Sequence, residues 1–160
     1  MSTISNCDDI IDTRDLIRHV EDLHDTLCSM HDDYIQALYE AGDYPDGHDE
    51  DEVKEALTKD HPFETFIEEC EDCEADEYRS AKSFLEDVES YTSEAHSGET
   101  LIHEDHFEEY AEQLADDIGA IDHKAGWPLN HIDWEAAARE LSHDYSEVDW
   151  DGQTYLVRSS

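Results

Sequence analysis

The chain has 160 residues and carries 46 Asp and Glu against 9 Lys and Arg, a formal net charge of -37. This balance excludes direct binding to a nucleic-acid backbone, which needs clustered Lys and Arg, and argues against docking on an anionic membrane surface. No apolar run approaches the roughly 18 residues that span a bilayer, and the first six residues lack the features of a secretory signal, so we expect a cytosolic protein. The 15 aromatic residues and the periodic apolar pattern favour a folded chain over a disordered one.

A long helix is predicted over residues 13–41. Asp12 or Thr13 can cap its start, and Gly42 is a normal stop. Its apolar residues fall at alternating steps of four and three, the heptad seam of a coiled-coil-like helix: Leu16, Val20, Leu23, Leu27, Met30, Tyr34 and Ala37. Such a helix would be about 43 Å long.

A second long helix is predicted after an acidic, turn-rich connection at 43–51 and a short helix at 51–59. It begins near Pro62, which suits the first turn of a helix, and runs to about Ala95. A polar stretch interrupts its seam, whose members are Phe63, Ile67, Cys70, Ala81, Phe84, Val88 and Tyr91. Neither long helix can bury its apolar stripe alone, so the two are expected to pair as an antiparallel hairpin.

A smaller unit is predicted after Ser97-Gly98. Two helices and two short strands are expected there, at 104–118, 134–143, 146–150 and 153–157, with Asp133 as the cap of the second helix. Asp151-Gly152 between two strands is a strong hairpin signal.

The predicted fold is therefore mainly α. A long antiparallel, coiled-coil-like helical hairpin at 1–96 would precede a small α+β module at 97–160, with two helices and a C-terminal β-hairpin. A dimer is also compatible with the heptad seam, although an intramolecular hairpin would use the same seam.

Motifs for metal binding and catalysis are weak. The acidic loops around Gly47 and Gly152 lack the ligand spacing of a calcium-binding EF-hand. One zinc site is conceivable across the hairpin, from His24, Cys28, Cys70 and Cys73, but a single CxxC is a weak signal. Nucleotide-binding and nucleophile motifs are absent from the sequence, so we expect neither an enzyme nor a cofactor.

The distribution of charge is more informative. Residues 14–94 contain 27 acidic and 6 basic residues, a net charge of -21. A duplex DNA segment of about 43 Å, the length of the expected hairpin, carries about 25 negative charges. The hairpin would therefore resemble DNA to a protein whose cleft is lined with Lys and Arg.

The C-terminal third carries a long motif, FEEYAEQLADDIGAI at 107–121 and WPLNHIDWEAAARELSHDYSEVDWDGQTYLVR at 127–158. It resembles the C-terminal part of the ArdA antirestriction family, and also small phage proteins that join this module to an acidic helical hairpin. Residues 1–96 do not show the β-rich N-terminal portion of that family. The resemblance implies an acidic DNA mimic that occupies the DNA-binding groove of type I restriction-modification enzymes in a bacterial cell. Six residues of the motif are expected to be structural: Trp127, Pro128, Asp133, Trp134, Tyr145 and Tyr155.

These observations together predict a DNA-mimic inhibitor of a bacterial DNA-binding defence system, either antirestriction or anti-CRISPR. The partner would be a restriction-modification or CRISPR effector protein with a basic cleft. The partner-facing residues would be exposed acids: Glu64, Glu68, Glu69, Glu71, Asp72, Glu86, Asp87, Glu89, Glu104, Asp105, Glu108, Glu109, Glu112, Asp116 and Asp117. The alternative is an acidic helical adaptor or scaffold that binds its partner through the apolar seam.

Overall fold

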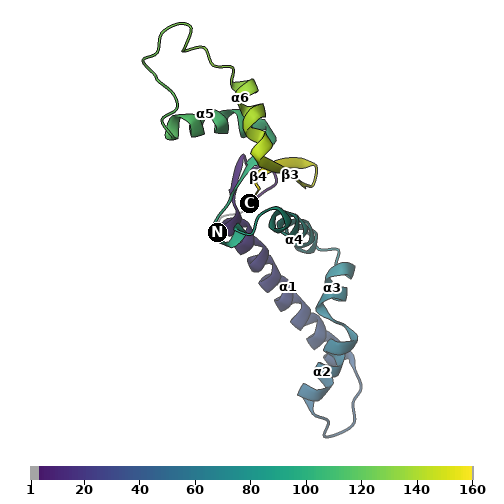
Figure 1. The fold of residues 1–160 in the computed structure, drawn as a ribbon. Coiled ribbons are helices and arrows are strands. Elements are labelled where there is room, and N and C mark those ends of the chain that lie inside the picture. The colour runs from purple at the N-terminus through teal and green to yellow at the C-terminus, as the bar shows by residue number, and fades with distance from the viewer. Residues whose placement is uncertain (1–3, 160) are drawn as a thin grey trace. The chain divides into compact units, whose positions relative to one another are not determined.

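A computed structural model describes residues 4–159, which are mainly helical with one small antiparallel sheet (Figure 1). The helices are α1 (Thr13–Ala41), α2 (Glu50–Asp60), α3 (Phe63–Glu69), α4 (Cys73–Tyr91), α5 (Phe107–Asp117) and α6 (Trp134–Leu141). The strands are β1 (Ile10–Asp12), β2 (Thr100–His103), β3 (Tyr145–Trp150) and β4 (Gln153–Arg158). Short 3-10 turns are η1 (Ala95–Ser97), η2 (Glu104–His106) and η3 (Ser142–Asp144). None of the helices in the described part of the chain is long and apolar enough to cross a bilayer.

The chain forms two compact units. Val20–Arg79 is one of them and is called the helical unit below. The other, called the sheet unit, combines the residues up to His19 with those from Ser80 onward. This division differs from the predicted segments 1–96 and 97–160, because β1 and the later part of α4 contribute to the sheet unit.

The sheet has the strand order β1-β2-β4-β3, and every neighbouring pair is antiparallel. The predicted C-terminal β-hairpin is confirmed as β3 and β4, whose ends lie within one residue of the predicted ones. Asp151 and Gly152 in its turn both have positive φ (48° and 86°), as this type of turn requires. Strands β1 and β2 were not predicted. They are only three and four residues long, too short for an alternating pattern to reveal them.

Both faces of the sheet are covered. On one face, Ile102 and Leu156 form a buried cluster with residues of α5 and α6. On the other face, Phe84 of α4 stacks on Trp150, with ring centroids 4.8 Å apart, and lies 5.6 Å from the ring of Tyr155. This second layer gives Phe84 an exposed fraction of only 1%.

A buried threonine joins the start of α1 to the turn before β2. The hydroxyl of Thr13 donates to the carbonyl of Ala95 at 2.6 Å and accepts from the amide of Glu99 at 2.8 Å. The amide of Thr13 also donates to the carbonyl of Glu99 at 2.9 Å. These bonds satisfy polar groups that would otherwise be buried without partners.

In the helical unit, α1 packs against α3 through aromatic contacts. The ring of His31 lies 5.8 Å from Phe63 and 5.2 Å from Phe66. The predicted bounds of α1 are confirmed, but burial departs from the heptad seam near its end, where Ile35 is buried and Ala37 exposed. An α-helix has 3.6 residues per turn, so a heptad stripe drifts around it unless a long partner supercoils with it. The helix α3 has only seven residues and is too short for that.

The prediction of one continuous helix from Pro62 to Ala95 is wrong. The chain leaves the helix at Cys70 and resumes it at Cys73, because Asp72 acts as a new N-terminal cap. The side chain of Asp72 accepts from the amide of Glu74 at 3.0 Å, and its carbonyl accepts from two further amides. Because the second predicted long helix is divided into α3 and α4, the structure does not confirm the long helical hairpin.

Candidate acidic interface

The fifteen carboxylates predicted to face a partner are all exposed. Five belong to the helical unit, on α3 and the segment after it: Glu64, Glu68, Glu69, Glu71 and Asp72. Ten belong to the sheet unit, on α4, η2 and α5: Glu86, Asp87, Glu89, Glu104, Asp105, Glu108, Glu109, Glu112, Asp116 and Asp117. Their role in binding stays a prediction.

Helix α5 gathers five of these carboxylates within ten residues. Phe107 and Ala111 lie one turn apart and are buried, whereas Glu108, Glu112 and Asp116 follow at four-residue steps and are exposed. At a rise of 1.5 Å per residue, the stretch from Glu108 to Asp117 is about 14 Å long, an average of about 3.4 Å per charge. Phosphates along one DNA strand have about the same spacing.

Histidines lie beside several of these carboxylates. The carboxylate of Asp116 is 2.5 Å from His123, and that of Glu109 is 3.2 Å from His106. Each contact is an ion pair only when its histidine is protonated.

The segment that follows α5 is of a different kind. Residues 118–132, called the neutral loop below, form all but the last residue of the long connection from α5 to α6 (Figure 1, green), which ends at Asp133, the cap of α6. They contain one acidic and one basic residue, Asp122 and Lys124. Four large apolar side chains of this loop are exposed: Ile118 (70%), Trp127 (80%), Leu129 (77%) and Ile132 (41%).

The six motif residues expected to be structural have different outcomes. Tyr155 is fully buried, and the side chain of Asp133 caps α6 by accepting from the amide of Ala136 at 3.0 Å. Both predictions are confirmed, and Trp134 and Tyr145 are half-buried. Trp127 and Pro128 are not core residues, because both are exposed in the neutral loop, where the carbonyl of Pro128 accepts from the amide of His131 at 3.1 Å and closes a turn.

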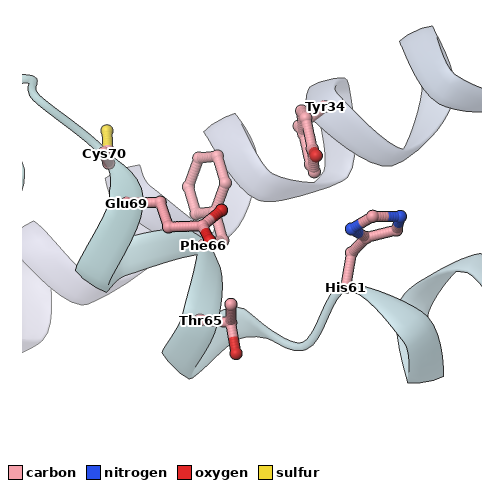
Figure 2. A pocket seen from close by; sticks show the side chains of 6 residues that line it. All are labelled: Tyr34, His61, Thr65, Phe66, Glu69 and Cys70. Atoms are coloured by element: carbon pink, nitrogen blue, oxygen red, sulfur yellow. The ribbon is translucent and has the colours of Figure 1, made fainter.

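A small half-open pocket lies in the helical unit between α1 and α3. Six residues line it, as Figure 2 shows: Tyr34, His61, Thr65, Phe66, Glu69 and Cys70. The ring of Tyr34 is 5.4 Å from that of Phe66 and 5.8 Å from that of His61, so aromatic groups form a continuous wall. Glu69 adds a carboxylate to the lining of this pocket. Aromatic faces beside a carboxylate are suited to a cationic side chain.

The conceivable zinc site is not formed. His24 and Cys28 approach within 3.7 Å, but within residues 4–159, which include Cys70 and Cys73, no three His, Cys, Asp or Glu side chains gather as metal ligands. Burial, with the nearby charges of Asp25 and Asp32, raises the pKa of the Cys28 thiol and so disfavours the thiolate that binds metal.

A scan against protein-family models and searches of curated proteins and of solved structures found no match to this chain. The resemblance of residues 107–158 to the ArdA family therefore rests on the sequence motif alone.

Sequence reasoning missed the neutral loop as a functional candidate. A signal for it was present, because fifteen residues without net charge are unusual in a chain with a net charge of -37.

Proposed function

We propose that this protein inhibits a bacterial DNA-binding defence protein by occupying its basic nucleic-acid-binding groove in place of DNA. The observation that supports the proposal best is the exposure of all fifteen predicted carboxylates in a chain with a net charge of -37. An exposed carboxylate can form an ion pair with a Lys or Arg side chain, as a phosphate does.

The binding energy would come mainly from long-range attraction and from the release of counterions held by both surfaces. Such binding does not require one continuous helical hairpin. It requires only a dense row of exposed carboxylates, and those of α5 follow one another at about the spacing of phosphates along one DNA strand over about 14 Å.

The partner class follows from the resemblance to the ArdA family. We infer that the target is a type I restriction-modification enzyme or a CRISPR effector, that inhibition takes place in the bacterial cytoplasm, and that the protein acts stoichiometrically rather than as an enzyme. The negative charge alone is compatible with any basic DNA-binding protein as the target. The resemblance to the ArdA family limits the proposed targets to bacterial defence proteins.

A competition experiment tests the proposal. The full chain is titrated at about 0.15 M salt into a type I restriction–methyltransferase bound to labelled duplex DNA, and separately into a DNA-bound Cas effector complex. We expect release of DNA at near-equimolar protein, weakened as salt is raised. No release from either complex by the folded protein would overturn the proposal.

A matched pair of charge-neutralised variants locates the surface. One variant changes the five carboxylates of α5 to amides: Glu108, Glu109, Glu112, Asp116 and Asp117. The control does the same at five exposed carboxylates of α2: Glu50, Asp51, Glu52, Glu55 and Asp60. Both lose five charges, so a loss of affinity at least about tenfold larger for the α5 variant assigns the contact to α5. Equal losses would show that only total charge matters.

The alternative, an adaptor that binds through the apolar seam of α1, makes an opposite prediction. Leu16 and Leu27 of that seam are fully buried within the chain, so a partner could reach only its remaining members. Under this alternative, Leu23→Asp would abolish binding, whereas the α5 variant would leave it unchanged.

A further inference from the structure

The neutral loop and α5 are adjacent in the sequence but have opposite surface chemistry. Residues 104–117 carry seven acidic residues and no Lys or Arg. The next fifteen residues have no net charge and expose four large apolar side chains. Leu129 and Ile132 line one cavity of this loop together. Adjoining apolar side chains exposed to water mark interaction surfaces, because their exposure is unfavourable.

The loop has defined local structure. Three backbone bonds turn it along its length, from Ala125 to Asp122, from Leu129 to Gly126 and from His131 to Pro128, at 2.9 to 3.1 Å. The contact between His123 and Asp116 joins its first part to α5. Trp127 and Leu129 are thus held outward by hydrogen-bonded turns.

The loop is also hollowed. A cavity of about 360 Å³ opens between its two halves, with Ile121, Leu129 and Ile132 among its lining residues. A second cavity of about 280 Å³ lies where Ile121 and His123 meet the acidic face of α5, at Glu112 and Asp116. Apolar and acidic surfaces therefore adjoin within the same unit, so one partner could contact both.

We propose that the neutral loop is an apolar docking element for the basic partner. Trp127 and Leu129 would be buried against an apolar patch of that protein, beside the Lys and Arg side chains that α5 engages. The inference rests on the proposed function, since it assigns a second contact with the same partner.

Charge complementarity selects this occupant. A second copy of the chain fits poorly, because pairing two neutral loops would bring two acidic α5 helices together and their like charges repel. Nucleic acid and anionic membranes are repelled by α5 for the same reason. A protein with positive charge beside an apolar patch is attracted by both parts of the surface.

The proposal separates two contributions to affinity. Contacts of α5 weaken as salt is raised, because salt screens exposed charges. Burial of Trp127 and Leu129 is not electrostatic and should contribute equally at every salt concentration. Loop variants should therefore shift the plot of log affinity against log salt without changing its slope, whereas the α5 variant should change the slope.

The test measures affinity of the full chain for the purified type I restriction–methyltransferase between about 0.05 and 0.3 M salt. The variants are Trp127→Ala and Leu129→Ala, and the control is Tyr91→Ala, an aromatic side chain that is 45% exposed on α4. We expect each loop variant to weaken binding by about tenfold or more at every salt concentration, and the control by less than about twofold. All three side chains are exposed, so the variants should fold, which circular dichroism checks.

A fluorescence measurement follows Trp127 directly. The chain is labelled with 5-hydroxytryptophan, whose emission can be excited apart from the tryptophans of the partner. Trp127 is 80% exposed, Trp134 is half-buried and Trp150 is only 4% exposed, so Trp127 is the tryptophan most accessible to acrylamide in the free chain. We expect binding to protect this emission, and the labelled Trp127→Phe variant to lose the change.

The outcomes distinguish the two proposals. If the wild-type chain binds neither defence complex, the proposed function fails and this inference fails with it. If the wild-type chain binds but the loop variants bind equally well, or emission of Trp127 is not protected, only the docking role of the loop is overturned. If Trp127→Ala instead dissolves a self-associated form seen by sedimentation, the occupant is a second copy and the proposal is wrong.

Discussion

The two units of this chain balance charge against apolar burial differently. The helical unit has 22 acidic and 3 basic residues among 60, a net charge of -19. The sheet unit has 24 acidic and 6 basic among 100, a net charge of -18. Of the 23 buried apolar residues within 4–159, 17 lie in the sheet unit and 6 in the helical unit. The helical unit thus has more repulsion per residue and less burial to oppose it, so we expect it to open first.

The largest expected effect is in the core of the sheet unit. Phe84→Ala removes a ring that is 1% exposed and that contacts the rings of Trp150 and Tyr155. We expect the free energy of unfolding to fall by about 3–5 kcal/mol, because a buried phenyl ring is replaced by a cavity. Urea unfolding followed by Trp fluorescence measures it. Ser83→Ala, at the exposed neighbouring position, should change stability little.

The second prediction concerns the core of the helical unit. Leu27→Ala removes a fully buried side chain of α1 and should cost about 2–5 kcal/mol. Because the helical unit has only 6 buried apolar residues among those described, the substitution should unfold this unit while the sheet unit stays folded. Hydrogen exchange should then show lost protection in residues 20–41 and retained protection in β2 and β4. Loss of protection in both units together would contradict the expectation that the helical unit opens first. Ser29→Ala, on the exposed face of α1, serves as the control.

Raising the salt concentration should have a smaller effect of opposite sign, a gain in stability. Raising salt from about 0.02 to 0.5 M screens repulsion among exposed carboxylates, so both units should gain stability. The helical unit should gain more, by about 1 kcal/mol or more in its local opening free energy, because its charge density is higher. Hydrogen exchange at the two salt concentrations measures this for each unit separately. Equal gains would show that charge density does not set the difference.

Elements whose signals were local could be predicted from the sequence. The bounds of α1 followed from Thr13 and Gly42, and the C-terminal hairpin followed from Asp151-Gly152. The sheet could not be completed, because β1 pairs with β2 across about ninety residues and neither strand is long enough to show alternation. The break before α4 was marked by Asp72, but the apolar spacing on either side of it favoured continuity.

The candidate site was predictable in one respect only. Exposure of the fifteen carboxylates follows from their charge, since an ionised side chain is rarely buried without a partner. The exposure of Trp127 was missed, although the absence of net charge at 118–132 was a signal, because the same motif holds core residues such as Tyr155 and Leu156. Membership of a motif does not by itself tell whether a side chain is buried or exposed.

The smallest expected effect is at a partly buried carboxyl of the sheet unit. Partial burial, with the neighbouring Glu94, raises the pKa of Glu99. A carboxyl with a raised pKa in the folded state favours folding when it is protonated, and this contribution is lost as pH rises through its titration range. At pH 7 the ionised Glu99 therefore disfavours folding, so Glu99→Gln should raise stability there by less than about 1 kcal/mol.

Thermal unfolding at two pH values isolates this contribution from the general relief of repulsion. The gain from Glu99→Gln should be present at pH 7 and absent near pH 3, where the wild-type carboxyl is already protonated in both states. The control is Glu112→Gln, which removes one exposed charge from the middle of α5 and gives the gain expected from charge reduction alone. If the two variants gain equal stability at pH 7, burial of Glu99 contributes nothing to the effect. The gain would then come only from weaker repulsion among the carboxylates on the surface of the sheet unit.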